Sequence, residues 1–375
     1  MGSRIAIFTC EYPPYPGGIA SYTREVARAA LRIGHEPVVY SFIDRGKTPP
    51  DDGFEVIRLK PDTYSHAKLP LLTLRAAGVL AKRSFDIVLA ADLQTLIALA
   101  PVATKAAKKA AVHGTDVRSR LLTRFFSSPL WRPLNAYESI FANSNFTRGL
   151  VLQTHPYFPA ERVVAALLGV GPYWREDIPA ESVQTLTGKF GLEPGRFVAA
   201  SVGRLEPRKG LHQAIAAIAA LPDSVRSAVT YLIVGRPVED AYRARLLSWI
   251  ASSGADIRLL GEIPETELRA IYHRANLLLH TACRDGERAE GFGLVLLEAA
   301  SCGLPALATH IDALPEVVMD GQTGFLVEDG AIDAMAGKLR AFIADPQILA
   351  ALSERCKSFA ATFTWDRCAR TTFGV

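Results

Sequence analysis

Short apolar runs alternate with helix-like segments along almost the whole chain, and this alternation constrains the fold more than any other feature. A strand followed by a helix and then by another strand is the βαβ unit, whose two strands lie parallel in one sheet. The sequence therefore predicts an α/β protein built on parallel sheets.

The alternation falls into two series, separated by a break at Gly169, Gly171 and Pro172 and a polar stretch up to Pro194. Two successive doubly wound series predict two Rossmann-like domains that face a central cleft. We expect residues 1–171 to form the first domain and residues 172–361 the second, with 362–375 returning to the first. The expected strands are 4–9, 37–42, 86–90, 109–113, 139–143 and 162–168 in the first series, and 197–202, 230–234, 257–260, 277–280, 306–308 and 325–327 in the second.

The composition suits a globular protein with large cores, because 49% of the 375 residues are hydrophobic and only 21% are charged. The net charge of +4 is small and no nucleic-acid-binding motif accompanies it, so we expect no nucleic-acid partner. The first apolar run is not a secretory signal, and the most apolar window, 85–104, contains two aspartates and a proline. These features predict a cytoplasmic protein.

The segment EGFGLVLLEAASCGLPALAT, residues 290–309, carries the clearest chemical pattern. Glu290 begins it, Glu298 follows eight residues later, and a glycine-rich turn between them leads into an apolar helical run. Such a turn exposes backbone N–H groups at the positive end of a helix dipole, which suits a phosphate. Carboxylates accept hydrogen bonds from hydroxyl groups. Together these groups indicate a nucleotide-sugar site.

Two other interpretations apply to the glutamate pair. A glycoside hydrolase needs carboxylates on opposing sides of a sugar, whereas Glu290 and Glu298 lie in one loop-helix segment, which disfavours that class. The second alternative, a helix with one buried and one surface glutamate, stays open.

The segment SVGRLEPRKG, residues 201–210, directly follows an expected strand, and we expect Arg204 and Lys209 to project toward the cleft. A departing nucleotide diphosphate develops negative charge that a metal or fixed cations must stabilise. The sequence contains no D-x-D pair, so we expect arginine and lysine in place of a metal, and no cofactor. The alternative is a solvated basic turn.

The first series offers weaker candidates. Gly17 and Gly18 follow the first strand and allow a ligand to approach the backbone, although the run is not G-x-G-x-x-G. His113 ends a strand, a position that favours function, although a lone histidine is often structural. Ser144 and Asn145 follow the next strand, and a helix N-cap explains them equally well.

These segments resemble a known family. The run at 290–309, continued by PEVVMDGQTGFLV at 315–327, resembles the signature of the family 4 glycosyltransferases, which have the GT-B fold. SVGRLEPRKG and the early PGG loop are similar to the same family's phosphate-binding parts. The insert CRDGERAEGFG looks most like that of the mannosyltransferases that extend phosphatidylinositol mannosides.

The resemblance implies roles for particular residues. Arg204 and Lys209 would bind the donor diphosphate, Glu298 the ribose hydroxyls and Glu290 the hydroxyls of the donor sugar. Further contacts would come from Gly17 and Gly18 to the donor phosphates, His113 to the transferred sugar, backbone near Gly235 and Ile263 to the base, and the amides of Phe292, Gly293, Leu294 and Val295 to sugar and phosphate.

The family's reaction implies a retaining, metal-independent transfer of a hexose, mannose being one candidate, to a hydroxyl of a glycan or lipid-linked acceptor. Two alternatives remain open from the residues alone. One is a non-catalytic subunit that binds a nucleotide sugar, and the other is a different GT-B activity such as an epimerase or a phosphorylase.

The chain departs from the family pattern at two places. Asp312 and Ala313 stand where the family often has Gly-Gly, and residues 168–171 read Leu-Gly-Val-Gly in place of Asn-Gly-Val-Asp. These departures affect the expected hinge and acceptor-side details.

Residues 118–134, RSRLLTRFFSSPLWRPL, mix arginines with leucine, phenylalanine and tryptophan. Such a mixture can dock on anionic lipid, which predicts peripheral contact with the inner face of a membrane. The alternative is a helix that packs its apolar side on the first domain and leaves its arginines in solvent.

Overall fold

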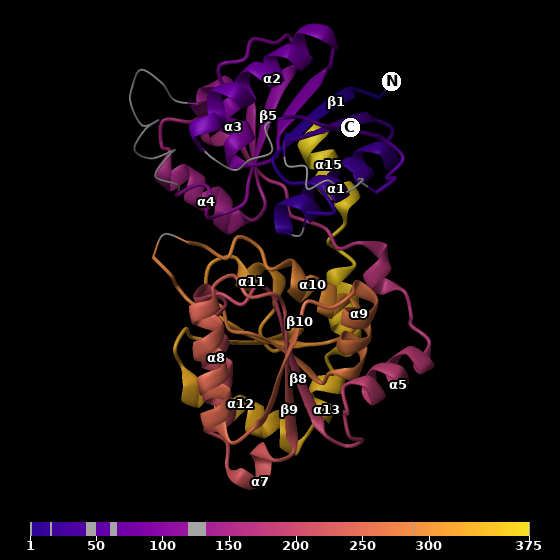
Figure 1. The fold of residues 1–375 in the computed structure, drawn as a ribbon, viewed down its shortest axis with the longest axis vertical. Helices are drawn as coiled ribbons and strands as arrows, with labels where there is room; N and C mark the ends of the chain where they lie inside the picture. The colour runs from indigo at the N-terminus through magenta and orange to yellow at the C-terminus, as the bar shows by residue number, and fades with distance from the viewer. Residues whose placement is uncertain are drawn as a thin grey trace. The chain divides into compact units, whose positions relative to one another are not determined.

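The computed structural model describes residues 2–15, 17–42, 50–60, 66–118, 133–286 and 288–374. The chain divides into two compact units, Met1–Gly169 with Thr364–Val375, and Val170–Phe363 (Figure 1). The first crossing between the units follows Gly169, two residues before the boundary expected from the sequence, and the second follows Phe363.

The first unit is built on a seven-stranded parallel sheet with the order β3-β2-β1-β4-β5-β6-β7. The chain extends the sheet from β1 to β3 on one side and then returns to place β4 on the other side of β1. This reversal of strand order between β1 and β4 is a topological switch point. The strands are β1 (Arg4–Thr9), β2 (Glu36–Ser41), β3 (Glu55–Arg58), β4 (Ile87–Ala90), β5 (Ala107–Val112), β6 (Ser139–Ala142) and β7 (Val163–Ala165).

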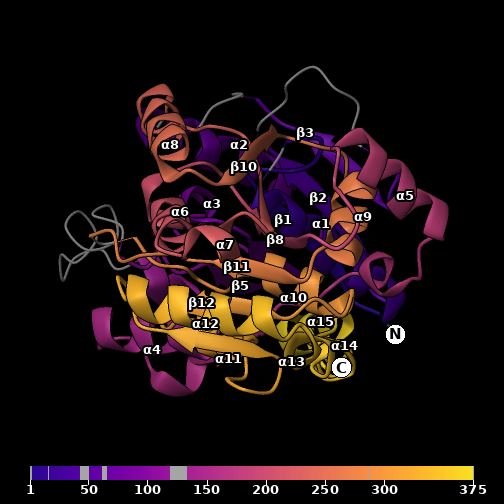
Figure 2. The same cartoon turned by 90° about the horizontal axis from the view of Figure 1, so that it is seen from below.

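The second unit repeats this plan with six parallel strands in the order β10-β9-β8-β11-β12-β13, so its switch point lies between β8 and β11 (Figure 2). The strands are β8 (Phe197–Val202), β9 (Val229–Val234), β10 (Asp256–Gly261), β11 (Leu277–His280), β12 (Ala306–Thr309) and β13 (Gly324–Val327).

Helices cover both faces of each sheet, as parallel sheets require. In the first unit, α1 and α15 pack together on one face and α2 and α3 on the other (Figure 1). The helices of this unit are α1 (Gly18–Arg32), α2 (Leu69–Lys82), α3 (Leu93–Leu99), α4 (Asn145–Thr154) and α15 (Trp365–Phe373).

In the second unit, α6 packs with α8 and α12, while α10 packs with α14 and α5 with α9. The helices are α5 (Ala180–Lys189), α6 (Leu211–Ala219), α7 (Asp223–Arg226), α8 (Asp240–Ser253), α9 (Glu265–Arg274), α10 (Leu294–Ser301), α11 (Leu314–Val317), α12 (Ile332–Ala344), α13 (Gln347–Ala350) and α14 (Ser353–Ala360).

Burial on both faces explains why the central strands read as continuous apolar runs. Every residue of β9 is buried, as is every residue of β4 and β11. The edge strand β3 has the sequence EVIR, which is partly exposed and carries a charge at each end. It lacks an apolar run, and the sequence analysis therefore missed it.

The final helix, α15, is nine residues long and belongs to the first unit. It packs on α1, where Arg32 and Asp366 form an ion pair at 2.6 Å, and Lys109 Nζ donates to Thr372 O at 2.7 Å. A Cβ atom at Gly169 would lie 2.1 Å from Trp365 N. Glycine at this junction position therefore allows the two crossing segments to pack closely.

Residues 119–132 lie outside the described residues, so the predicted membrane contact through 118–134 stays a prediction. Among the helices that the structure does describe, none is both long and apolar enough to cross a membrane.

Candidate functional site

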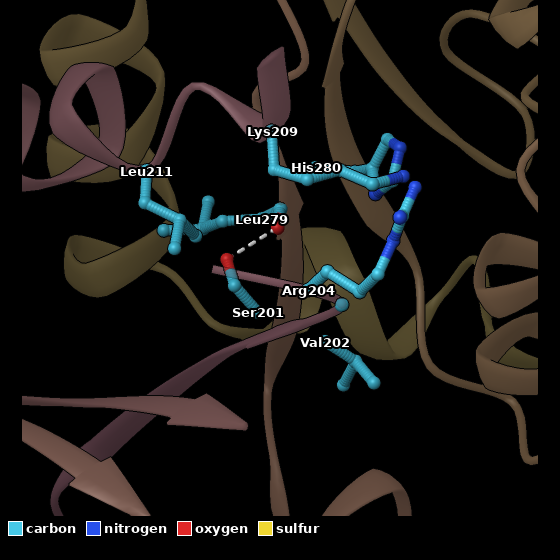
Figure 3. Close-up of a pocket in the computed structure, with 8 residues that line it drawn as sticks. Ser201, Val202, Arg204, Lys209, Leu211, Leu279 and His280 are labelled. Carbon is cyan, nitrogen blue, oxygen red and sulfur yellow. Dashed lines mark hydrogen bonds between the residues drawn. The ribbon is translucent and has the colours of Figure 1, made fainter. Parts of the chain in front are cut away.

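A pocket opens at the carboxyl ends of β8 and β11, where the strand order of the second sheet reverses (Figure 3). Ligands of open α/β sheets bind at this kind of position. The residues that line the pocket are Ser201, Val202, Gly203, Arg204, Lys209, Leu211, Leu279 and His280.

The loop after β8 is fixed against the loop after β11. The loop ends in a short 3₁₀ turn, Pro207–Lys209, followed by Gly210 in the left-handed conformation with φ of 61°. A Cβ atom at Gly210 would lie only 1.7 Å from Thr281 O, and Thr281 Oγ1 donates to Gly210 O at 2.9 Å. Cys283 N donates to Arg208 O at 2.9 Å. The backbone that carries Lys209 is therefore held at the end of β11.

Glu290 forms two ion pairs through one oxygen. Its Oε2 accepts from Lys209 Nζ at 2.7 Å and from Arg208 Nη1 at 2.6 Å, and the residue is only 8% exposed. Burial alone would raise the pKa of this carboxyl, but Lys209 and Arg208 outweigh it and hold the pKa well below its ordinary value. Glu290 is therefore charged at physiological pH and acts as an acceptor.

Glu206 continues the ion network away from Glu290. Its Oε1 pairs with Arg208 Nη2 at 3.1 Å and with Arg204 Nη2 at 3.0 Å. The Arg204 side chain is 51% exposed, whereas Glu206 and Arg208 are buried. Of the arginines in this network, Arg204 is thus the one that solvent and ligands can reach.

His280 lies at the end of β11 and is 4% exposed, yet its Nε2 has no hydrogen-bond partner among the residues that the structure describes. That nitrogen lies 4.0 Å from Glu290 Oε2. Burial first and then the charge of Lys209 lower the pKa of His280 to about 4, so the ring is neutral at physiological pH. Figure 3 shows its ring beside the Lys209 side chain, with the Arg204 guanidinium on the same side of the pocket.

Asp312 holds the backbone of Glu290. Its Oδ2 accepts from Glu290 N at 2.8 Å. Among the described residues, Asp312 is the only non-glycine residue with positive φ, at 49°. Aspartate tolerates this region better than most residues. Asp312 therefore adopts this left-handed conformation without glycine and adds a contact to Glu290.

The turn after Glu290 leads into α10 as the sequence predicts. Gly293 is the N-cap with φ of 88° and offers no side-chain cap, and the first turn of α10 has no acidic residue. Phe292 is buried with its ring 6.1 Å from that of Phe363, while Leu294 and Val295 are partly exposed. The first amides of α10 thus lie at an uncapped helix N-terminus that suits an anion.

Glu298 lies on α10 in a different environment. Tyr272 OH donates to its Oε2 at 3.5 Å. Burial, and then the charge of Glu265, raise the pKa of Glu298 to about 7. Unlike Glu290, this carboxyl titrates close to neutral pH.

The two positions expected near the base are Gly235 and Ile263. A Cβ atom at Gly235 would lie 1.7 Å from Gly203 O, so only glycine allows the ends of β8 and β9 to approach. Gly235 N donates to Gly261 O at 2.8 Å. Ile263 is partly exposed in the loop between β10 and α9.

The remaining candidates belong to the first unit. Gly17 is the N-cap of α1, and Gly18 begins that helix. His113, at the end of β5, has Nε2 2.9 Å from Ala91 O, and its ring packs edge-on against Tyr22 of α1 at 4.7 Å. Because Tyr22 belongs to α1, this contact brings His113 close to the first turns of that helix.

The helix-cap interpretation holds for Ser144. It is the N-cap of α4, and its side chain accepts from Thr147 N at 2.9 Å. Asn145 is the first residue of that helix.

In the second unit, the structure brings Arg204, Lys209 and Glu290 together, and three residues that were not predicted from the sequence join them. Glu206 and Arg208 lie within the segment 201–210 and read there as surface charges. His280 ends the run LLLH as a polar residue at a strand's carboxyl end, which was the available signal.

The described residues contain no group of three or more His, Cys, Asp or Glu side chains placed to hold a metal ion.

Two family models match successive parts of the chain. The model described as Glycosyltransferase Family 4 matches residues 16–170, and the model described as Glycosyl transferases group 1 matches residues 183–361. The two matches follow the division into units and together cover most of the chain.

Two curated relatives are similar to this chain in sequence. O-antigen chain mannosyltransferase B of Escherichia coli is 28% identical over 67% of this chain and 64% of its own length. The GDP-mannose-dependent alpha-(1-6)-phosphatidylinositol monomannoside mannosyltransferase of Mycolicibacterium smegmatis is 28% identical over 92% of this chain and 91% of its own.

Solved structures share the architecture. Anabaena HepE in complex with UDP and glucose superposes with a TM-score of 0.80 at 20% identity, covering 98% of this chain and 97% of that one. Sucrose-phosphate synthase from Thermosynechococcus elongatus gives a TM-score of 0.80 at 19% identity, covering 98% and 96%. These likenesses confirm the predicted GT-B fold.

Proposed function

The chain belongs to the family 4 glycosyltransferases, and from that premise we propose a retaining, metal-independent transfer of a hexose to a hydroxyl of a glycan or glycolipid. As a glycosyltransferase, the protein takes its sugar from a nucleotide sugar.

One observation carries the proposal: Arg204, Lys209 and Glu290 meet around the pocket at the β8–β11 switch point. Two cations, Arg204 and Lys209, line this pocket, and a charged carboxylate lies next to Lys209. The cations suit a diphosphate and the carboxylate suits sugar hydroxyls, so the two halves of a nucleotide sugar find complementary groups within one site.

In the proposed reaction, the bond between the sugar C1 and the diphosphate oxygen breaks. A bond from the acceptor oxygen to C1 forms on the same face, and the acceptor's proton passes to the departing phosphate. Arg204 and Lys209 stabilise the developing charge, each charge-assisted hydrogen bond contributing about 1.5–3 kcal/mol.

The glutamates bind hydroxyls in this account. Glu290 Oε2 is occupied by Lys209 and Arg208, while Oε1 makes no hydrogen bond to the described residues. Oε1 is therefore the atom offered to a hydroxyl of the donor sugar. Glu298, on the next helix, is offered to the ribose hydroxyls, and the amides from Phe292 to Val295 to sugar and phosphate.

We assign acceptor binding to the first unit, with His113 at the transferred sugar and Gly17 and Gly18 at the donor phosphates. A cytoplasmic location and peripheral lipid contact through 118–134 stay predictions.

Mannose is the first sugar to test, because both curated relatives described above are named as mannosyltransferases and one is named as GDP-mannose-dependent. UDP-glucose is the second donor to test, because a related fold has been solved with UDP and glucose.

The test begins with a thermal-shift screen across GDP-, UDP- and ADP-sugars, followed by transfer assays with the stabilising donor and mannoside or glycolipid acceptors. Both are run in excess EDTA, and NMR assigns the anomeric configuration of the product. We expect one donor class to stabilise the protein and a product that keeps the donor's configuration. Inversion, or activity that EDTA abolishes and a divalent cation restores, would contradict the proposal.

A further inference from the structure

Three cations lie in the network around Glu290, but only two of them face the pocket. Arg204 and Lys209 line it, and Arg208 does not. Arg208 is 8% exposed, and both ends of its guanidinium are used within the protein, Nη1 by Glu290 at 2.6 Å and Nη2 by Glu206 at 3.1 Å. Arg208 therefore stands behind the site and does not reach a ligand in the pocket.

Lys209 differs from Arg208 in how firmly it is held. Its ammonium has three donors, and its hydrogen bond to Glu290 Oε2 uses one of them. A lysine on a flexible stem can turn toward a phosphate, whereas an arginine held at both ends of its planar fork cannot do so without breaking two pairs. Of the two cations on Glu290 Oε2, Lys209 is the one free to engage a donor diphosphate.

That movement would leave Glu290 dependent on its other neighbours. A buried carboxylate without a counter-ion takes up a proton and becomes a donor in place of an acceptor. Within the described part of the chain, the groups that face Glu290 are Arg208, Lys209 and His280, with Asp312 on its backbone N–H. His280 is neutral at physiological pH, because burial and the charge of Lys209 lower its pKa to about 4.

We propose that Arg208 is a positioning residue: it is the permanent counter-ion that keeps Glu290 ionised and oriented while Lys209 binds the donor diphosphate. This inference rests on the proposed function for the role of Lys209, but the Arg208–Glu290 pair itself is independent of it. Glu206 holds the other end of Arg208 and so fixes the direction from which the guanidinium meets Glu290.

The kinetic test compares Arg208→Gln and Arg208→Lys with the wild-type chain. We expect Arg208→Gln to lower kcat at least about tenfold at pH 7 while the KM for the donor changes less than about threefold. The acid limb of its kcat profile should move at least about one pH unit toward higher pH, because an opposite charge next to a carboxyl lowers its pKa by about 1–3. Arg208→Lys keeps the positive charge but not the planar guanidinium, so its kcat and its acid limb should lie between those of Arg208→Gln and wild type.

Arg258→Gln is the matched control. Arg258 pairs with Asp256 at 2.7 Å in the same unit and lies outside the candidate site. We expect this variant to lose stability and to keep the wild-type acid limb. An unchanged acid limb in Arg208→Gln, or a rise in donor KM with kcat unchanged, would overturn the inference.

A second readout needs no transfer. With isotope-labelled glutamate, and Glu290→Gln to assign the Glu290 resonance, the carboxyl is titrated with and without GDP or UDP. In the wild type the nucleotide should leave Glu290 charged down to about pH 5, whereas in Arg208→Gln it should raise the pKa of Glu290 into the titrated range, and in Arg208→Lys it should raise that pKa by less. Identical titrations in all three proteins would refute the role of Arg208, even if one variant proves unstable.

These arms separate the two ideas. A wild-type protein that transfers no sugar from any nucleotide sugar would contradict the proposed function, while the titration would still test the Arg208–Glu290 pair. A wild-type protein that transfers sugar, together with an Arg208→Gln variant of unchanged pH profile, would contradict the inference alone.

Discussion

Glu290 and Glu298 are identical side chains eight residues apart in one segment, yet their surroundings shift their pKa values in opposite directions. Glu290 meets Lys209 and Arg208, which hold its pKa well below the ordinary value despite burial. Glu298 meets Tyr272 and the charge of Glu265, and burial raises its pKa to about 7. Glu290 is buried and Glu298 is half-buried, and the charges next to the two carboxyls are of opposite sign.

The residues that surround each glutamate come from distant parts of the chain. The cations on Glu290 come from the loop after β8, 81 and 82 residues earlier, whereas Tyr272 on α9 faces Glu298. The loop after β8 therefore supplies the charges that lower the pKa of Glu290. Changes to that loop should therefore shift the pKa of Glu290 and leave the pKa of Glu298 unchanged.

Removing the lysine should have the largest effect. Lys209→Ala deletes a cation that lines the pocket, and we expect kcat/KM to fall about 10²–10³-fold because fixed charge at a departing group is worth that much. Lys189→Ala is the control, since Lys189 pairs with Glu267 on the surface. Steady-state kinetics with the best donor measure both. A kcat/KM of Lys209→Ala within tenfold of wild type would contradict the role assigned to Lys209.

Displacing the loop should be the next largest change. Gly210→Ala places a Cβ atom 1.7 Å from Thr281 O at a φ of 61°, and we expect a loss of at least about 2 kcal/mol of unfolding free energy together with most of the activity. Urea denaturation measures the free energy.

Gly337→Ala is the control for that substitution, because Gly337 lies within α12 with no atom within 4 Å of an added Cβ. It should stabilise the protein by about 0.5–1 kcal/mol. Equal destabilisation by both substitutions would contradict the role given to the Gly210 contact.

Glu298→Gln tests the raised pKa of Glu298 through the pH dependence of stability. The folded pKa of Glu298, about 7, lies above its ordinary value of 4.5, so Glu298 lowers stability progressively as pH rises from about 4.5 to 7. Glu298→Gln removes that loss, and thermal melts should show the variant gaining on wild type between pH 5 and pH 8. Glu290 has the opposite sign: its depressed pKa gives stability above its ordinary pKa that is lost as pH falls. A constant difference in melting temperature across the pH range would argue against the raised pKa.

The smallest effect should come from Tyr272→Phe. The hydroxyl lies 3.5 Å from Glu298, at the limit of a hydrogen bond, and it opposes the rise in the pKa of Glu298. We expect donor affinity within about threefold of wild type, and a slightly higher pH for the Glu298 transition. A loss of tenfold or more would mean that Tyr272 contacts the ligand itself.

The sequence predicted most of the fold because buried parallel strands leave a strong local signal. Arg4–Thr9, Phe197–Val202 and Leu277–His280 were expected at the bounds observed. The edge strand Glu55–Arg58 escaped because it is partly exposed and lacks an apolar run.

The site was predictable where it depends on local pattern, and not where it depends on pairing. Arg204, Lys209 and Glu290 follow strands or begin a glycine-rich turn, and each of those features can be read from neighbouring residues. That Arg208 pairs with Glu290, 82 residues away, depends on how two loops meet. No local pattern distinguishes Arg208 from a solvated arginine, so its burial appears only in the folded unit.

Glu290 pairs with Lys209 in the structure, and we expect a donor diphosphate to replace Glu290 as the partner of Lys209. Calorimetric titration of GDP or UDP into wild type, Lys209→Ala and Glu290→Gln measures this exchange. Removing the carboxylate frees the lysine, so we expect Glu290→Gln to bind the nucleoside diphosphate at least as tightly as wild type while losing transfer. Lys209→Ala should bind it at least about tenfold more weakly. Equal weakening in the two variants, or unchanged affinity in Lys209→Ala, would contradict the account.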